Sequence, residues 1–198
     1  MKIITISREF GSGGRELGKR LAEELGIHCY DHEIIELIAK EHGFDERYVA
    51  NISEKCIEAA YPMTIGHRFA MPPVQIMDQG FQVAAAQQQI IENFAKQGDC
   101  VIVGRCADYI LKDYENVVNI FIRANLDFRI KRSIQVDQLD ESKAGEIVSK
   151  KDKSRGNYYR YHAGERWDNL MNYDLVLRSD LVGIDKAVEC IKNYVEAM

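Results

Sequence analysis

Apolar and polar positions at the start of the chain change from a strand pattern to a helix pattern across a glycine-rich stretch. The short apolar run Ile3 to Ile6 is typical of a buried strand. Beyond the glycines, Leu17, Leu21 and Leu25 recur every fourth residue on one helical face, and Gly26 then ends the helix. The pattern predicts a strand, a glycine loop and a helix in this order.

Four more apolar runs predict further strands, and segments with helical periodicity separate them. These runs are Ile27 to Tyr30, Cys100 to Val103, Val117 to Ile122 and Leu175 to Leu177. Helices are expected between Asp31 and Gly43, around Glu46 to Ala60, over Phe81 to Lys96, up to Lys112, from Leu126 to about Gln135, from about Glu141 onward and over Ile184 to Ala197, with Asp31 and Asn125 as N-caps. Such alternation predicts an α/β fold with a five-stranded parallel sheet and helices on both faces.

One stretch does not fit this alternation. The residues from Phe44 to Gly80 include all three prolines, at positions 62, 72 and 73, and show at most one helix pattern. The stretch predicts an inserted segment in a chain of 198 residues that otherwise forms a single domain.

The glycine loop has the composition of an anion-binding site. Gly11, Gly13 and Gly14 allow backbone N–H groups to turn inward at the positive end of the following helix, which predicts phosphate as the ligand. The P-loop pattern G-x-x-x-x-G-K-[ST] is not met, since Arg8 replaces its first glycine, and Gly14 and Arg15 replace its lysine and hydroxyl residue. A plain glycine turn between strand and helix is the alternative.

Charge and cysteine content limit the classes of partner. The formal net charge is -5 and the pI is about 5.6, which argues against a general binder of nucleic acid or of anionic membranes. The five cysteines lack the spacing of a metal or redox site and fit reduced thiols in a cytoplasmic protein. The N-terminus shows no signal-peptide pattern, and no apolar run approaches the ~18 residues that span a bilayer.

A basic segment occurs in the C-terminal third of this acidic chain. Between Lys150 and Arg166 there are six basic residues against two acidic ones, and tyrosines are interleaved with them. The basic residues are Lys150, Lys151, Lys153, Arg155, Arg160 and Arg166. The segment predicts a lid over a nucleotide base, a contact with RNA, or a solvated helix face.

Candidate ligand residues follow the predicted strands, because ligands of parallel sheets bind at the carboxyl ends of the strands. Asp31 follows the second strand, Arg105 the third and Arg123 the fourth. We expect Arg105 to bind an anion, whereas Asp31 could equally serve as a helix cap.

Several motifs together resemble the cytidylate kinase-like family, in the right order and over nearly the whole chain. They are Ser7 to Glu16, Tyr30-Asp31, Val101 to Arg105 with Ala107-Asp108, Asp152 to Arg155, Trp167 and Tyr173 to Leu175. The resemblance implies a P-loop nucleoside monophosphate kinase fold, with an inserted acceptor-binding segment at about 44–80 and a lid at about 136–172. It also implies transfer of the γ-phosphoryl group of ATP to CMP or a related monophosphate, in the presence of Mg²⁺.

The resemblance further implies a donor site and an acceptor site. The loop is expected to bind the phosphates of ATP through Gly11, Ser12, Gly13, Gly14 and Arg15. The acceptor is expected to contact Asp31, Arg105 and Asp108. In cytidylate kinases an aspartate follows the Gly-Arg pair, and Cys106 occupies this position here.

Positive charges from the lid and its base are expected to neutralise the transferring phosphoryl group. The expected catalytic residues are Arg15, Arg129, Arg132 and Arg155, with Asp152 to orient the base of the lid. Arg15 is expected to replace the charge of the missing lysine, with Lys19 on the same helix face as the alternative, and phosphates and water would hold Mg²⁺. A nucleotide or anion sensor of the same fold without turnover is the alternative, which the altered loop favours.

Overall fold

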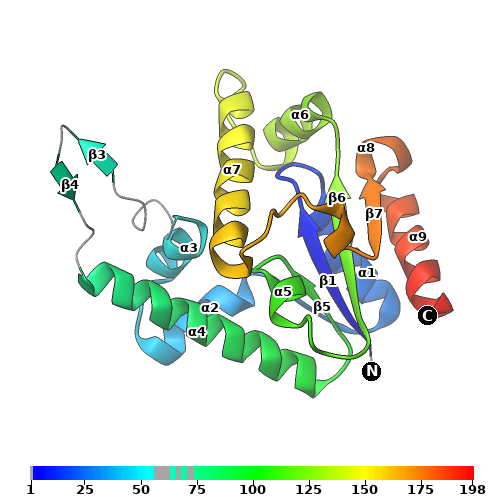
Figure 1. Ribbon diagram of the computed structural model, residues 1–198. Coiled ribbons are helices and arrows are strands. Elements are labelled where there is room, and N and C mark those ends of the chain that lie inside the picture. Colours follow the sequence, from blue (N-terminus) through cyan, green and yellow to red (C-terminus); the bar gives the residue numbers. More distant parts are fainter. Residues whose placement is uncertain (1, 56–62, 66–67, 71–73) are drawn as a thin grey trace.

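The computed structural model describes residues 2–55, 63–65, 68–70 and 74–198, which are built around one central sheet (Figure 1). Its strands all pair in parallel, in the order β2-β5-β1-β6-β7. They are β1 (Ile3–Arg8), β2 (His28–Tyr30), β5 (Cys100–Val103), β6 (Val117–Arg123) and β7 (Leu175–Arg178). The predicted five-stranded parallel sheet is therefore confirmed.

Helices alternate with these strands, as the periodicity predicts. They are α1 (Gly14–Leu25), α2 (Glu33–His42), α3 (Glu46–Lys55), α4 (Val74–Gln97), α5 (Ala107–Ile110), α6 (Leu126–Val136), α7 (Ala144–Ala163), α8 (Ser179–Val182) and α9 (Ile184–Ala197), with a short 3-10 turn, η1 (Leu170–Asn172). Among the described helices, none combines the length and the apolar character that crossing a membrane requires.

Both faces of the sheet are covered because its strands are apolar on both sides. On one face, α1 and α9 pack on Ile4 and Ile6, and on the other, α2, α4 and α5 pack around Ile3 and Ile102 (Figure 1). The central strand β1 is hydrogen-bonded to β5 and to β6. The loop after β1 therefore begins from the middle of the core.

Of the two N-cap residues predicted from the sequence, one caps its helix in the structure. Asn125 caps α6, because its Oδ1 accepts a hydrogen bond from the Phe128 amide at 3.0 Å. The prediction for Asp31 is wrong, since His32 is the N-cap of α2 and the Asp31 carboxylate pairs with Arg15 instead. An ion pair with a neighbouring helix has replaced the local cap.

The inserted segment contains more regular structure than its prolines suggest. Helix α3 lies within the predicted helix of residues 46–60, of which residues 56–60 lie outside the described part of the chain. The strands β3 (Met63–Ile65) and β4 (Arg68–Ala70) form an antiparallel hairpin that the sequence did not predict. Helix α4 begins before Phe81, because Gly80 lies within the helix and does not interrupt it.

Replacing Leu17 with alanine should lower the free energy of unfolding by about 2–5 kcal/mol, because its side chain is fully buried between α1 and the sheet. Denaturant unfolding measures this change. The matched control is Leu181→Ala, whose side chain is 70% exposed and whose loss should change stability by less than about 0.5 kcal/mol. Similar losses at the two positions would contradict this description of the core.

Candidate active site

The glycine loop connects the end of β1 to the first turn of α1, and other elements hold its shape. The buried Ser12 hydroxyl donates to the Glu9 carbonyl at 2.9 Å. From the beginning of α8, the Ser179 hydroxyl donates to the Ser12 carbonyl at 2.6 Å. The loop is therefore fixed by a hydrogen bond of its own and by α8, which directly follows the edge strand β7.

Close packing accounts for two of the loop glycines. Gly11 and Gly13 have φ values of 77° and 83°, in the left-handed region. A Cβ atom on Gly11 would lie 2.5 Å from the Arg129 carbonyl oxygen, and one on Gly13 would lie 2.5 Å from Ile184 Cδ1. These glycines are required by the fold itself, so their presence alone does not establish phosphate binding.

The backbone amides of the loop give independent support for an anion site. Within the described part of the chain, the amides of Gly11, Gly13 and Gly14 have no hydrogen-bond acceptor. They lie at the N-terminal end of α1, where the helix dipole favours negative charge. The loop thus retains the donors that a phosphate group requires, and these residues fit the phosphates of a nucleotide.

Helix α7 is bound to this loop by Asp152. One carboxylate oxygen of Asp152 accepts a hydrogen bond from the Phe10 amide at 2.7 Å, and the other pairs with the Arg129 guanidinium. Arg129 is only 10% exposed, and its Nε also donates to the Ala124 carbonyl at 3.1 Å. The structure therefore brings together Arg129 and Asp152, two of the predicted catalytic residues.

A second contact between α7 and the loop involves Arg155. Its Nη1 donates to the Arg8 carbonyl at 3.0 Å, and its guanidinium carbon lies 5.3 Å from the centre of the Phe10 ring. Cation and ring are thus within the range of a favourable cation–π interaction. Arg155 therefore lies against the end of β1.

The other two predicted catalytic arginines are paired with carboxylates near the start of α1. Arg132 forms an ion pair with Glu16, and its Nε would lie 3.3 Å from a Cβ atom on Gly13. Arg15 pairs with Asp31, and its side chain is 59% exposed. Arg132 therefore lies against the loop, whereas Arg15 and Asp31 form a pair between the start of α1 and the end of β2.

A cavity of about 50 Å³ opens at the carboxyl ends of β1 and β5. Arginine and aromatic side chains dominate its walls. The lining residues are Ser7, Arg8, Gly104, Arg105, Cys106, Arg155, Tyr158, Tyr159 and Trp167. The cavity contains Arg105 from the predicted acceptor site and Arg155 from the predicted lid, and Asp31 is not among its lining residues.

The backbone that carries Arg105 has an unusual conformation. Gly104, Arg105 and Cys106 have φ values of 75°, 60° and 54°, so three consecutive residues are left-handed. This region is unfavourable for residues with a side chain, and such strain occurs often at functional sites. Gln87 from α4 holds the turn, because its side-chain amide donates to the Arg105 carbonyl at 2.9 Å.

Asp108 is 4% exposed and lies next to the cavity wall instead of in the cavity. One of its oxygens accepts a hydrogen bond from the Tyr159 hydroxyl at 2.8 Å, and the other has no hydrogen-bond partner among the residues that the structure describes. Burial raises the pKa of this carboxyl group. A direct contact between Asp108 and the acceptor stays a prediction.

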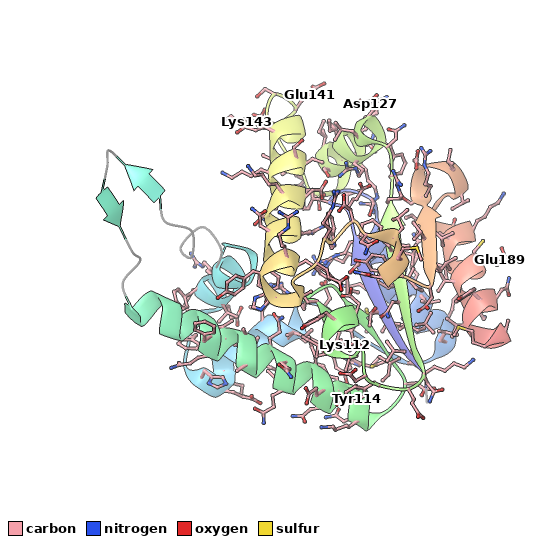
Figure 2. The ribbon with its side chains drawn as sticks, viewed as in Figure 1. Lys112, Tyr114, Asp127, Glu141, Lys143 and Glu189 are labelled. Atoms are coloured by element: carbon pink, nitrogen blue, oxygen red, sulfur yellow. The ribbon has the colours of Figure 1, made fainter. Side chains whose placement is uncertain are left out.

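The predicted basic segment divides between the loop and the solvent. Arg155 reaches the loop, whereas Lys150, Lys153 and Arg160 are exposed. Outside this segment, the labelled side chains of Asp127, in the first turn of α6, and of Glu141 and Lys143, just before α7, project outward (Figure 2). Only part of the basic segment therefore belongs to the candidate site.

Two residues that the sequence did not single out as ligands belong to this site. Arg8 was recognisable only as a departure from the P-loop pattern, and Gln87 occurs in a helix without any motif. For a metal ion, no group of three or more histidine, cysteine or acidic side chains occurs among the described residues. Binding of Mg²⁺ therefore stays a prediction that depends on the nucleotide.

The chain is similar in sequence and in fold to known proteins. A cytidylate kinase from Staphylothermus marinus is 24% identical over 198 residues, with 99% of this chain and 97% of the relative covered. An uncharacterized protein from Eubacterium ventriosum has a similar structure, with a TM-score of 0.75 and 28% identity over the full length of both chains. A shikimate kinase from Bacteroides thetaiotaomicron shares the fold, with a TM-score of 0.59 and 11% identity over 98% of each chain.

The family match extends over most of the molecule. It covers residues 3–181, from the beginning of β1 to α8, and thus includes the glycine loop, the cavity and α7. This chain belongs to the cytidylate kinase-like family.

Proposed function

We propose that this protein transfers the γ-phosphoryl group of ATP to CMP or a related nucleoside monophosphate. The observation that carries the proposal is the convergence of unpaired loop amides with arginine side chains at the carboxyl ends of β1 and β5. Phosphoryl transfer requires mainly alignment of two phosphates and neutralisation of oxygen charge, and these groups can supply both. Family membership is the second support.

The donor and the acceptor are assigned to opposite sides of the loop. The amides of Gly11, Gly13 and Gly14, at the start of α1, would bind the phosphates of ATP. Arg105, in the cavity, would bind the phosphate of the acceptor. In the reaction, an acceptor phosphate oxygen forms a bond to the γ-phosphorus while the bond from that phosphorus to ADP breaks.

Arginines around the loop would stabilise the negative charge of the transition state. Arg155 already contacts the backbone of β1, and Arg129 is fixed by Asp152. Arg132 would have to exchange Glu16 for a phosphate group. Mg²⁺ would be held mostly by the nucleotide phosphates and water, and would neutralise part of their charge.

One experiment decides between this proposal and a sensor without turnover. The protein is incubated with ATP, Mg²⁺ and each nucleoside monophosphate, and ADP formation is measured beside thermal-shift titrations of the same ligands. Acceptor-dependent ADP formation supports the kinase. Binding of ATP without ADP formation supports the sensor, which the absent lysine and hydroxyl residue of the loop favour.

Arg105→Ala should raise KM for the monophosphate about tenfold or more and leave KM for ATP nearly unchanged, because a charged hydrogen bond to the acceptor phosphate is lost. Steady-state kinetics with each substrate varied measures both constants. Arg166→Ala is the control, since Arg166 is exposed and paired with Asp168 at 2.7 Å. A rise in KM for ATP alone would show that the donor and acceptor sites are reversed.

Asp152→Asn should lower the free energy of unfolding by about 1–3 kcal/mol and reduce kcat, because the mostly buried Arg129 loses one of its two carboxylate partners and keeps only Glu9, which lies 3.5 Å from its Nε. Asp168→Asn removes an exposed partner of Arg166 and should cost less than about 1 kcal/mol. Denaturant unfolding and single-turnover rates provide the two measurements. If the Asp152 variant behaves like this control, then Asp152 does not organise the site.

A further inference from the structure

The strongest unexplained feature of the site is Arg8, which occupies the place of the first glycine in the P-loop pattern. Arg8 is the last residue of β1, and its side chain lines the cavity beside Arg105 and Arg155. Its guanidinium group approaches the left-handed turn after β5, where a Cβ atom on Gly104 would lie 2.8 Å from Arg8 Cζ.

The stem of the same side chain passes over the start of α1. A Cβ atom on Gly14 would lie only 2.6 Å from Arg8 Cβ and 3.0 Å from Arg8 Cγ. Real Cβ atoms do not approach each other so closely in folded proteins. Gly14 must therefore lack a side chain because Arg8 has one, whereas the atoms that approach Gly104 belong to the flexible end of Arg8.

Gly14 occupies the position of the P-loop lysine. The usual pattern combines a glycine at the first position with a lysine at the seventh, and this chain has an arginine at the first and a glycine at the seventh. The two differences from the pattern are therefore linked, because the Arg8 side chain occupies the space that a side chain at position 14 would need. One positive charge is retained, but it projects from the strand and not from the helix.

We propose that Arg8 binds phosphate oxygens in the cavity and supplies the positive charge that the loop lysine supplies in other P-loop proteins. This inference rests on the proposed function and extends it to a residue that enters from the acceptor side. Arginine suits the role because its planar fork can bind two phosphate oxygens at once. Arg105 and Arg155 line the same cavity, so a phosphate group there would meet three guanidinium groups.

Arg15, to which the sequence alone assigns this charge, is the competing candidate. Its guanidinium pairs with Asp31, and its side chain is mostly exposed. Arg8 instead lies in the cavity, and Arg155 holds its carbonyl at 3.0 Å. The end of β1 is therefore fixed by the same helix that would close over the ligand.

The close contact between Arg8 and position 14 can be tested without any ligand. Gly14→Ala should lower Tm in the parent protein, whereas the same change in an Arg8→Gly background should have little effect, because the colliding stem is absent. Gly156→Ala is the control, since a Cβ atom there would lie 3.9 Å from its nearest neighbour, Trp167 Cε3. An equal loss of Tm in both backgrounds would contradict the proposal that the Arg8 side chain excludes a side chain at position 14.

The phosphate-binding role of Arg8 is tested with inorganic pyrophosphate as the probe, by calorimetric titration of the full chain. Arg8→Gln should weaken binding at least tenfold, Arg8→Lys should recover part of the loss, and Arg8→Gly combined with Gly14→Lys should bind more tightly than Arg8→Gly alone. Lys192→Gln removes one positive charge on α9 and should bind like the parent. Binding by Arg8→Gln within twofold of the parent, or no binding by the parent, overturns the proposal.

These results separate this inference from the proposed function. If pyrophosphate binding depends on Arg8 but no monophosphate accepts a phosphoryl group, the kinase assignment is wrong and the role of Arg8 stands. If transfer occurs and the Arg8 variants bind pyrophosphate as the parent does, the kinase assignment stands and the role of Arg8 is wrong.

Discussion

The ion pair between Asp152 and Arg129, with the hydrogen bond from the Phe10 amide to the same carboxylate, holds the candidate site together. It joins the loop after β1 to α6 and α7, which the chain supplies much later. A mostly buried pair of this kind adds little net stability, because desolvation of the two charges offsets their attraction. The pair matters for the geometry of the site, because Asp152 without Arg129 would be a mostly buried charge that has lost its cationic partner, whereas Arg129 without Asp152 would keep only the Glu9 carboxylate, 3.5 Å from its Nε.

The architecture could be predicted because it depends on short-range patterns. Strands that are buried on both faces are continuously apolar, and the leucines of α1 lie on one helical stripe. The hairpin of β3 and β4 escaped prediction because each strand has three residues and pairs only with the other. Strands of this length leave too little alternation of polar and apolar residues to recognise.

The candidate site could be predicted only as a set of residue types. Arg105 and Arg155 line the same cavity, which agrees with their positions after a strand and in a basic segment. Pairing is a matter of three-dimensional distance, so the sequence could not show that Asp31 binds Arg15 or that Tyr159 binds Asp108. The position of Arg8 could not be predicted for a similar reason, because the side chain approaches Gly14 and Gly104, which lie in separate parts of the chain.

The left-handed turn from Gly104 to Cys106 depends on a residue from another part of the chain. Left-handed Arg105 and Cys106 each carry about 1–3 kcal/mol of strain, so the turn needs an external support, and a buried glutamine of α4, only 3% exposed, provides one. The same glutamine is hydrogen-bonded to the Tyr158 hydroxyl at 3.0 Å. Gln87 thus joins α4 to the turn and to α7, so a substitution at position 87 would change the position of Arg105 without removing a side chain that lines the cavity.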